Sequence, residues 1–355
     1  MLMLKKTIAA LSLLSILAAC QNDENPSQPE PKPRQDINLT RAEQEFMDKG
    51  TDFAFRFFDQ VCSTEKEKPN VFVSPLSASL CLSMITNGAT DNTLAEMQNV
   101  LGFPANTFSL DDLNNYNQKL TSALLDLDNT TQLGIANSIW IEEGFKVYDS
   151  FVDVNKKMYD AQVQELDFTS PTAKDVINQW CATQTNNCIK EVIQEIPADA
   201  RMYLINALYF KGIWKSQFDK SATGQDNFTN VDGSQQKVAM MNQTATFSYT
   251  QTDDFSIAEL PYGNEAFSMV ILLPSGDKTL DESLPNLNYE NWKQWSKNMV
   301  GKELQIKLPR FKVEYDKELL HRTYWQTLLS MLIKQSLPIC PVQNYILAFC
   351  NSLLI

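Results

Sequence analysis

The feature that most constrains the fold is the run Met202–Phe210. Every residue in it is apolar or aromatic except one amide, Asn206. A strand that is covered on both faces has such a continuous apolar run, whereas a half-exposed strand alternates. The run therefore predicts a strand inside a large sheet. Asn206 shares a face with Leu204 and Leu208, and an unpaired buried amide costs about 1–3 kcal/mol. We expect Asn206 to have partners, either as an ordinary satisfied core amide or in a polar latch where the sheet must open.

The residues around this strand predict helices first and mostly antiparallel strands after them. That order, with no linker between Asn38 and Tyr315, is typical of a single α+β domain. Helix starts are expected at a capping box, Thr40–Glu43, at Pro75, and at a further box, Thr93–Glu96, with a helix stop at Gly102. The other expected strands are Thr131–Ile141, the hairpin of Ser256–Tyr262 and Phe267–Leu273, and Leu304–Glu314 with Pro309 inside it.

Composition limits the classes of function. The chain has 355 residues, 43% of them hydrophobic, and is long enough to bury a core without a disulfide or a metal. Its formal net charge of -13, without any basic run, argues against a nucleic-acid partner. We expect a monomer.

The N-terminus resembles the leader of a bacterial lipoprotein. Lys5 and Lys6 precede a short apolar stretch that ends in the sequence Leu17–Cys20, which resembles a lipobox. The prediction is a signal peptide over residues 1–19, a lipid on Cys20, and a Pro-rich tether over residues 20–38. The chain would then be exported and anchored to the cell envelope, on a face that the sequence does not fix. An ordinary secretory signal with a chance cysteine is the alternative.

The remaining cysteines do not fall in the pattern of a disulfide scaffold. Cys62 and Cys81 are expected to be buried thiols, whereas Cys181 and Cys188 could pair in an oxidising compartment. With a single histidine, His321, and no paired C-x-x-C, we expect no metal and no cofactor. The same lack of histidines argues against a Ser-His-Asp or Cys-His active site, so an enzyme is not expected.

An ordered set of motifs resembles the serpin family over about Ala42 to Leu320. The motifs are Asn70–Ser77, Gly88–Ala89, Asn92–Thr93, Glu96–Met97, Leu101–Phe103, Leu204–Trp214, Phe218–Asp219, Met240–Met241, Glu259–Tyr262, Met269–Pro274 and Leu308–Lys312. The resemblance implies an α+β fold with helices around three mostly antiparallel sheets and a large central sheet. It also implies an inhibitor of serine or cysteine proteases, whose cleaved reactive-centre loop inserts into that sheet and traps the protease.

The resemblance also implies where the central sheet opens. Ser74 and Ser77 match the serines packed beneath the sheet, and Asn206 matches their strand partner, at the region called the shutter. Trp214 matches the residue at the top of the opening, called the breach. A polar cluster can be satisfied in two strand arrangements, which would give the buried amide a gating role beside its support of the fold.

The C-terminus departs from the family. Residues 321–355 contain no Asp, Glu or Gly, although the chain has 43 acidic residues, which indicates a disrupted reading frame. We interpret residues 39–320 as an incomplete serpin-like domain and residues 321–355 as a divergent tail. This interpretation replaces the reactive-centre loop and the closing strands, so we expect this chain not to trap proteases and to leave apolar surface exposed.

Two alternatives stay open. The tail could be genuine and pack into the gap, although its Leu, Ile and Cys runs lack the alternation of a sheet strand. The whole chain could also be a lipid-anchored binding or structural protein that keeps the scaffold without inhibition, with the membrane contacted through the anchor alone.

Overall fold

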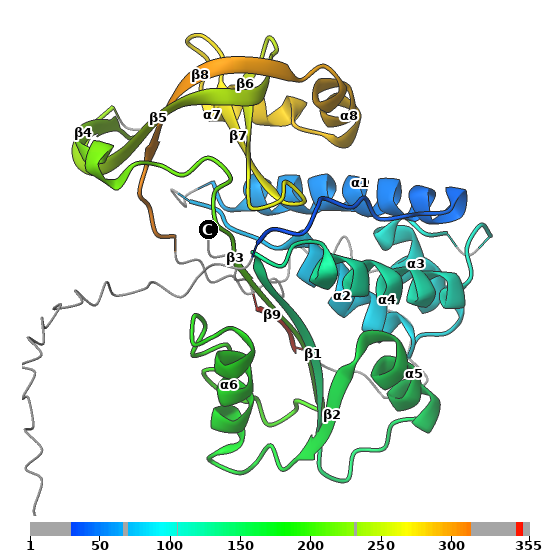
Figure 1. Cartoon of the computed structure of the whole chain (residues 1–355). Coiled ribbons are helices and arrows are strands. Elements are labelled where there is room, and N and C mark those ends of the chain that lie inside the picture. Colours follow the sequence, from blue (N-terminus) through cyan, green and yellow to red (C-terminus); the bar gives the residue numbers. More distant parts are fainter. Residues whose placement is uncertain (1–29, 67–69, 105, 231–232, 314–345, 351–355) are drawn as a thin grey trace, which may run out of the picture. The chain divides into compact units, whose positions relative to one another are not determined.

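The run Met202–Phe210 forms the strand β3 (Met202–Lys211) of a four-stranded sheet, in a computed structural model that describes residues 30–66, 70–104, 106–230, 233–313 and 346–350. The sheet order is β2 (Ala161–Leu166), β1 (Gln132–Glu142), β3 and β9 (Ile346–Cys350). β3 pairs antiparallel with β1 and parallel with β9, and β1 pairs parallel with β2. Figure 1 shows β3 between β1 and β9. The predicted interior strand is therefore confirmed.

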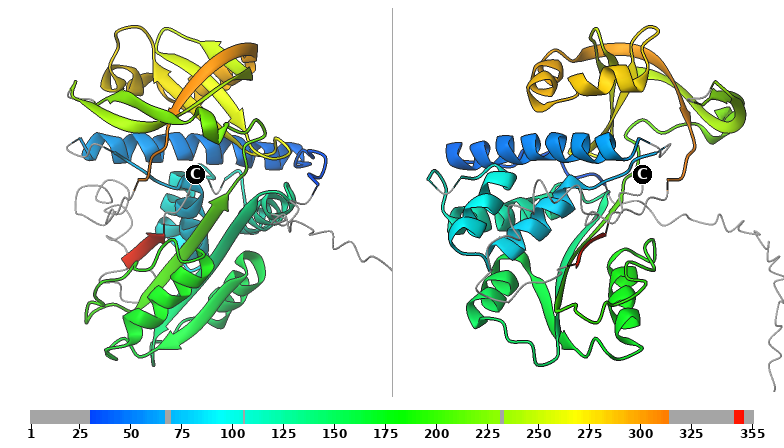
Figure 2. Two further views of the ribbon diagram at one scale, coloured as in Figure 1. Left: turned by 60° about the vertical axis from the view of Figure 1, so that its left-hand side comes forward. Right: turned by 180° about the vertical axis from the view of Figure 1, so that it is seen from behind.

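Helices cover both faces of this sheet (Figures 1 and 2). On one face, Ile139 and Leu204 pack in a core with α1 (Arg41–Thr64), α2 (Pro75–Thr86), α3 (Asp91–Leu101), α4 (Leu110–Asp126) and α5 (Asp149–Tyr159). On the other face, Trp140 and Tyr203 pack against α6 (Ala173–Gln184). Because neighbouring residues of a strand point to opposite faces, β3 needs apolar residues at nearly every position.

The second sheet contains five strands. Its order is β4 (Gly224–Thr229), β5 (Gln235–Gln251), β6 (Phe255–Pro261) and β7 (Ser268–Pro274), with β8 (Val300–Pro309) paired to β5. The hairpin of β6 and β7 is confirmed. Where the resemblance implies three sheets, the described residues form two, because the 17-residue β5 joins β4, β6 and β8 through its own backbone. α7 (Leu280–Ser283) and α8 (Tyr289–Lys297) connect β7 to β8, and the α+β class is confirmed.

Two helix starts follow the sequence and one does not. Thr40 caps α1 with a capping box to Glu43, and α2 begins at Pro75. The box predicted at Thr93 is wrong, because α3 begins at Asp91 after an extended Thr90 and already contains Thr93 in a helical turn. Gly102 ends α3 in the left-handed conformation that a glycine adopts without strain.

The last predicted strand is also displaced. The sequence predicts a strand over Leu304–Glu314 with Pro309 inside, whereas β8 runs over Val300–Pro309 and ends at the proline. A proline donates no hydrogen bond to a ladder, so it terminates the strand more readily than it continues it.

The cysteines of the described residues are all free thiols. Cys81 is buried as predicted, while Cys62 is half-buried. Cys181 is buried in α6 and Cys188 is exposed beyond its end, so the pairing left open for them does not form. Cys20, Cys340 and the signal peptide lie outside the described residues.

The described part of the Pro-rich segment has no helix or strand. It contacts the domain at Lys32, whose backbone N–H donates to Asn129 Oδ1 at 2.8 Å and whose ammonium pairs with Asp126 at 2.8 Å. From Pro31 onward the chain forms one unit. None of the helices in the described ranges is both long and apolar enough to span a bilayer.

The cap of α1 yields a stability prediction. Thr40→Ala removes the hydroxyl that accepts from the Glu43 N–H and should lower the free energy of unfolding by about 1 kcal/mol in urea titration. Thr51→Ala is the control, because its hydroxyl donates to Met47 O inside the same helix and its loss should change stability by less than about 0.5 kcal/mol. Equal effects of the two changes would contradict the assigned cap.

Candidate functional site

Asn206, the buried amide of β3, forms a hydrogen bond with a residue of the neighbouring strand β1. Asn206 is 0% exposed, and its Nδ2 donates to Asn137 Oδ1 at 2.8 Å. Asn137 stands directly opposite in β1 and donates in turn to the backbone oxygen of Tyr159 at 2.7 Å. The chain of two amides ties β3 to β1 and β1 to the end of α5. Within the described residues, Asn206 Oδ1 accepts no hydrogen bond.

The two serines lie at the start of α2, on the side of the sheet that Asn206 faces. Ser74 caps α2 by accepting from the Ser77 N–H at 3.3 Å, and the two hydroxyls are 2.9 Å apart. The resemblance matches both serines with Asn206 as their strand partner, and this match stays a prediction. Among the described hydrogen bonds, the two serines bond to each other and Asn206 bonds to Asn137, so the amide pair is a polar contact between the two strands.

Sequence reasoning missed Asn137, although the sequence contained a signal. Asn137 lies at the same parity as Leu133, Ile135 and Ile139 in the alternating strand, which makes it a polar residue on an apolar face. The same argument singled out Asn206. Two such residues on neighbouring strands predict a pair only if the register is known, and the register came from the structure.

Cys81 of α2 lies against the same point of β3. Burial raises the pKa of the Cys81 thiol to about 12, although a hydrogen bond from the Asn206 backbone N–H lowers it in part. A thiol in this environment stays protonated and unreactive at neutral pH. Cys81 therefore contributes packing and a weak acceptor to the contact between α2 and β3, without nucleophilic chemistry.

Trp214 lies where the chain leaves β3 and rests on Tyr262. The two residues form an isolated antiparallel bridge, and their rings are stacked with centroids 4.4 Å apart. Tyr262 also meets Phe210 at the end of β3, with centroids 5.3 Å apart. A Cβ at Gly212 would lie 2.7 Å from the Tyr262 ring, so only glycine allows this approach. The predicted breach residue is thus one member of an aromatic cluster that joins β3 to the end of β6.

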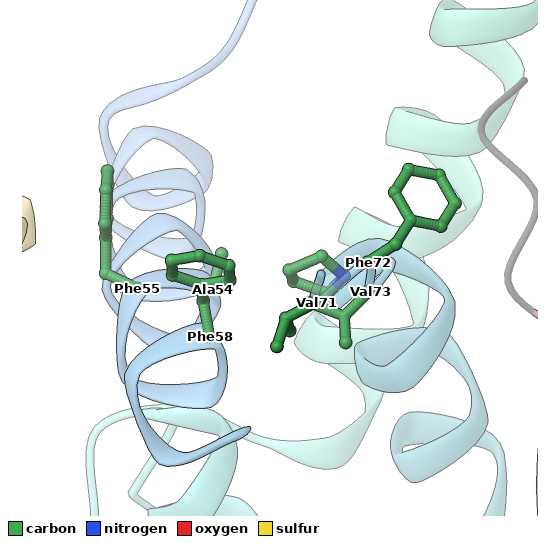
Figure 3. A pocket seen from close by; sticks show the side chains of 7 residues that line it. Ala54, Phe55, Phe58, Val71, Phe72 and Val73 are labelled. Carbon is green, nitrogen blue, oxygen red and sulfur yellow. The ribbon is translucent and has the colours of Figure 1, made fainter. Parts of the chain in front are cut away.

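A separate apolar groove of about 300 Å³ lies between α1 and the extended segment that precedes α2. Figure 3 shows Phe58 of α1 and Val71 of that segment projecting toward the space between the two elements. Its walls are lined by Ala54, Phe55, Phe58, Val71, Phe72, Val73 and Pro75. The groove offers dispersion and burial to an apolar occupant and carries no charged side chain.

The described residues hold no cluster of three or more His, Cys, Asp or Glu side chains that could bind a metal ion. The chemistry available at the amide pair and the aromatic cluster is hydrogen bonding and stacking. Such contacts can hold or release a strand, and the site is therefore conformational in character.

Comparisons with known proteins agree with the motif analysis. A family profile described as "Serpin (serine protease inhibitor)" matches residues 48–323. An uncharacterized serpin-like protein of Methanosarcina acetivorans is 33% identical over 274 residues, which span 75% of this chain and 63% of that protein. Human serpin B3 is 31% identical over 284 residues, which span 74% and 72% of the two chains. The solved native state of the thermophilic serpin tengpin matches with a TM-score of 0.71 at 28% identity, covering 85% of this chain and 74% of its own.

The amide pair yields a prediction about coupling. Asn137→Ala and Asn206→Ala should each lower the free energy of unfolding by about 1–3 kcal/mol, because each change leaves the other buried amide without its hydrogen bond. In a double-mutant cycle the two losses should fall short of additivity by about 1 kcal/mol. Asn155→Ala is the control, since that buried amide donates to Met84 O and Phe151 O and should add independently to the loss at Asn206. Strict additivity of Asn137 and Asn206 would contradict the pair.

Proposed function

Because the chain belongs to the serpin family, we propose that it is a lipid-anchored serpin whose own C-terminal tail prevents it from trapping a protease. Serpins in general are inhibitors of serine proteases and not enzymes. The chain spans 63% of the archaeal relative that it matches, so the inhibition of serine or cysteine proteases is part of this proposal.

The observation that carries the proposal is the position of β9. This strand comes from the divergent tail and pairs in parallel with β3, with Phe349 opposite Asn206. In the trapping mechanism the sheet must part beside the shutter and accept the cleaved loop as a new strand. A strand of the tail at this edge occupies backbone groups of β3 that a new neighbour would need.

The pairing of β9 differs from the expectation for the tail. A tail that packs into the gap is the alternative left open by the sequence, and the missing alternation of the Leu, Ile and Cys runs argues against it. A short continuous apolar run is also compatible with a strand covered on both faces, and this interpretation fits the observed pairing with β3. We therefore favour a tail that adds to the central sheet over a tail that only adds apolar surface.

Two further features support a changed C-terminus. The family match ends at residue 323, close to the point where acidic residues and glycine disappear from the sequence. The groove between α1 and Val71–Val73 is an apolar surface of the kind that an incomplete core would expose. Both features favour a scaffold without a reactive-centre loop, with a binding or structural role as the alternative function.

Incubation with trypsin or chymotrypsin tests the proposal. We expect no complex that survives denaturing electrophoresis, because no acyl-enzyme is trapped, and no rise in melting temperature after cleavage. An inhibitory serpin treated in the same way is the positive control and should give both signals. A stable covalent complex with this chain would overturn the proposal.

The anchor is tested separately. Cys20→Ser in the full chain should abolish incorporation of labelled palmitate and move the protein from the membrane fraction to the soluble fraction, since the acceptor thiol is lost. Cys188→Ser, at an exposed free thiol, is the matched control and should leave both readouts unchanged. Palmitate labelling that persists in Cys20→Ser would exclude Cys20 as the lipidation site.

A further inference from the structure

A buried carboxylate lies at the turn between α4 and β1. Asp128 is 4% exposed, and its Oδ1 accepts from the Thr130 N–H at 2.8 Å and from the Thr130 hydroxyl at 2.7 Å. Its Oδ2 accepts from the Thr131 hydroxyl at 2.9 Å. These three local bonds hold the carboxylate in one orientation.

The second oxygen reaches a turn that is distant in sequence. Asp128 Oδ2 accepts from the Asn264 N–H at 3.3 Å, and Asn264 Nδ2 donates back to the Leu127 oxygen at 2.7 Å. Gly263, which precedes Asn264, has a φ of +39°, and a Cβ on it would overlap Asp128 Oδ2 and Thr130 Oγ1. The close approach therefore requires glycine, and the two turns are clamped in both directions.

The same distant turn supports the breach residue on its other side. The Gly263 N–H donates to the Ile213 oxygen at 2.8 Å, and the Lys215 N–H donates to the Pro261 oxygen at 3.0 Å. Tyr262, between these two contacts, carries the stacked ring of Trp214. The turn at residues 262–264 therefore contacts Asp128 on one side and the segment that leaves β3 on the other.

We propose that Asp128 is a positioning residue for the breach: it clamps the turn at residues 262–264 and thereby keeps Trp214 stacked and the exit of β3 closed. The inference goes beyond the proposed function, because it concerns how this end of the sheet is held and applies whether or not the chain traps a protease. The clamp acts through Asn264 and Tyr262 and not by direct contact of Asp128 with Trp214.

The charge of Asp128 gives the clamp a pH dependence. Burial acts to raise the pKa of Asp128, but the hydrogen bonds from Thr130, Thr131 and Asn264 outweigh it and hold that pKa below its ordinary value. The group therefore stabilises the closed form above the ordinary aspartate pKa, and this contribution is lost as the pH falls through the lowered value.

Other ionisable groups near the clamp are paired or neutral. Glu265, on the same turn as Asn264, forms an ion pair with Lys215 of the segment that leaves β3. Asp126, at the end of α4, forms an ion pair with Lys32. Burial raises the pKa of the Tyr262 hydroxyl, so this group stays neutral over the range in which Asp128 titrates.

Hydrogen–deuterium exchange of the full chain tests the clamp. In Asp128→Asn, the side-chain NH₂ takes the place of one carboxylate oxygen, and a donor there cannot accept the bonds that this oxygen accepted. The backbone N–H groups of residues 210–216 and 260–266 should therefore exchange about ten-fold faster. Amides of α2 should keep their rates. Asp126→Asn is the matched control at the end of α4: its side chain is exposed and, among the described residues, forms an ion pair with Lys32, so the change should leave all of these rates unchanged.

A pH series and a milder variant separate positioning from general support. In the native chain, the exchange rate of residues 210–216 relative to α2 should stay level from about pH 7 down to about pH 5 and rise as the pH falls below about 4, whereas in Asp128→Asn this ratio should be flat. Thr131→Val removes one donor to Asp128 and keeps the charge, so exchange in residues 210–216 and 260–266 should rise by less than in Asp128→Asn. If Asp128→Asn does not fold, this milder variant tests the positioning role. Faster exchange spread evenly over α2 and both segments, or no change in either variant, would overturn the proposal.

Discussion

The burial of β3 on both faces is the constraint on which the rest of the molecule depends. In the first half of this strand, Met202 and Leu204 pack against the layer of α1–α5, while Tyr203, Ile205 and Ala207 pack on the side of α6. A strand in this position has no face on which a polar group can reach water, so any polar group must be satisfied by a neighbour. Asn206 meets this requirement through Asn137, and the requirement links the position of β1 and the end of α5 to one residue.

The pairing of Asn206 is incomplete in an informative way. Its Nδ2 donates to Asn137, yet its Oδ1 accepts no bond from the described residues, which leaves an acceptor at the surface of β3 that faces α2. A buried acceptor without a donor costs free energy, and a rearranged strand that supplied a donor would recover it. The gating role that the resemblance implies for Asn206 stays a prediction.

The sequence could predict the elements whose signals lie within a few neighbouring residues. It could not predict side-chain contacts between residues that are distant in the chain. The continuous run of β3, the capping box at Thr40 and the hairpin of β6 and β7 each depend on a few neighbouring residues, and all three are confirmed. The amide pair joins residues 69 positions apart, and the clamp at Asp128 joins residues 136 positions apart. No local pattern marks Asp128 as a partner of Asn264, because the contact exists only once β1 and the β6–β7 turn are placed. The predicted roles of Ser74, Ser77 and Trp214 in opening the sheet stay predictions.

The two ends of β3 differ in how they are held, and this difference bears on what the tail can change. At Tyr203–Ala207 the edge of β3 is covered by β9, so the backbone there has a neighbour drawn from the tail. Beyond Lys211 the chain is held instead by Tyr262 and the turn that Asp128 clamps. The parallel ladder and the stacked rings share no residue, although both lie on one strand and its continuation. The contacts that hold Trp214 therefore include no hydrogen bond from the tail.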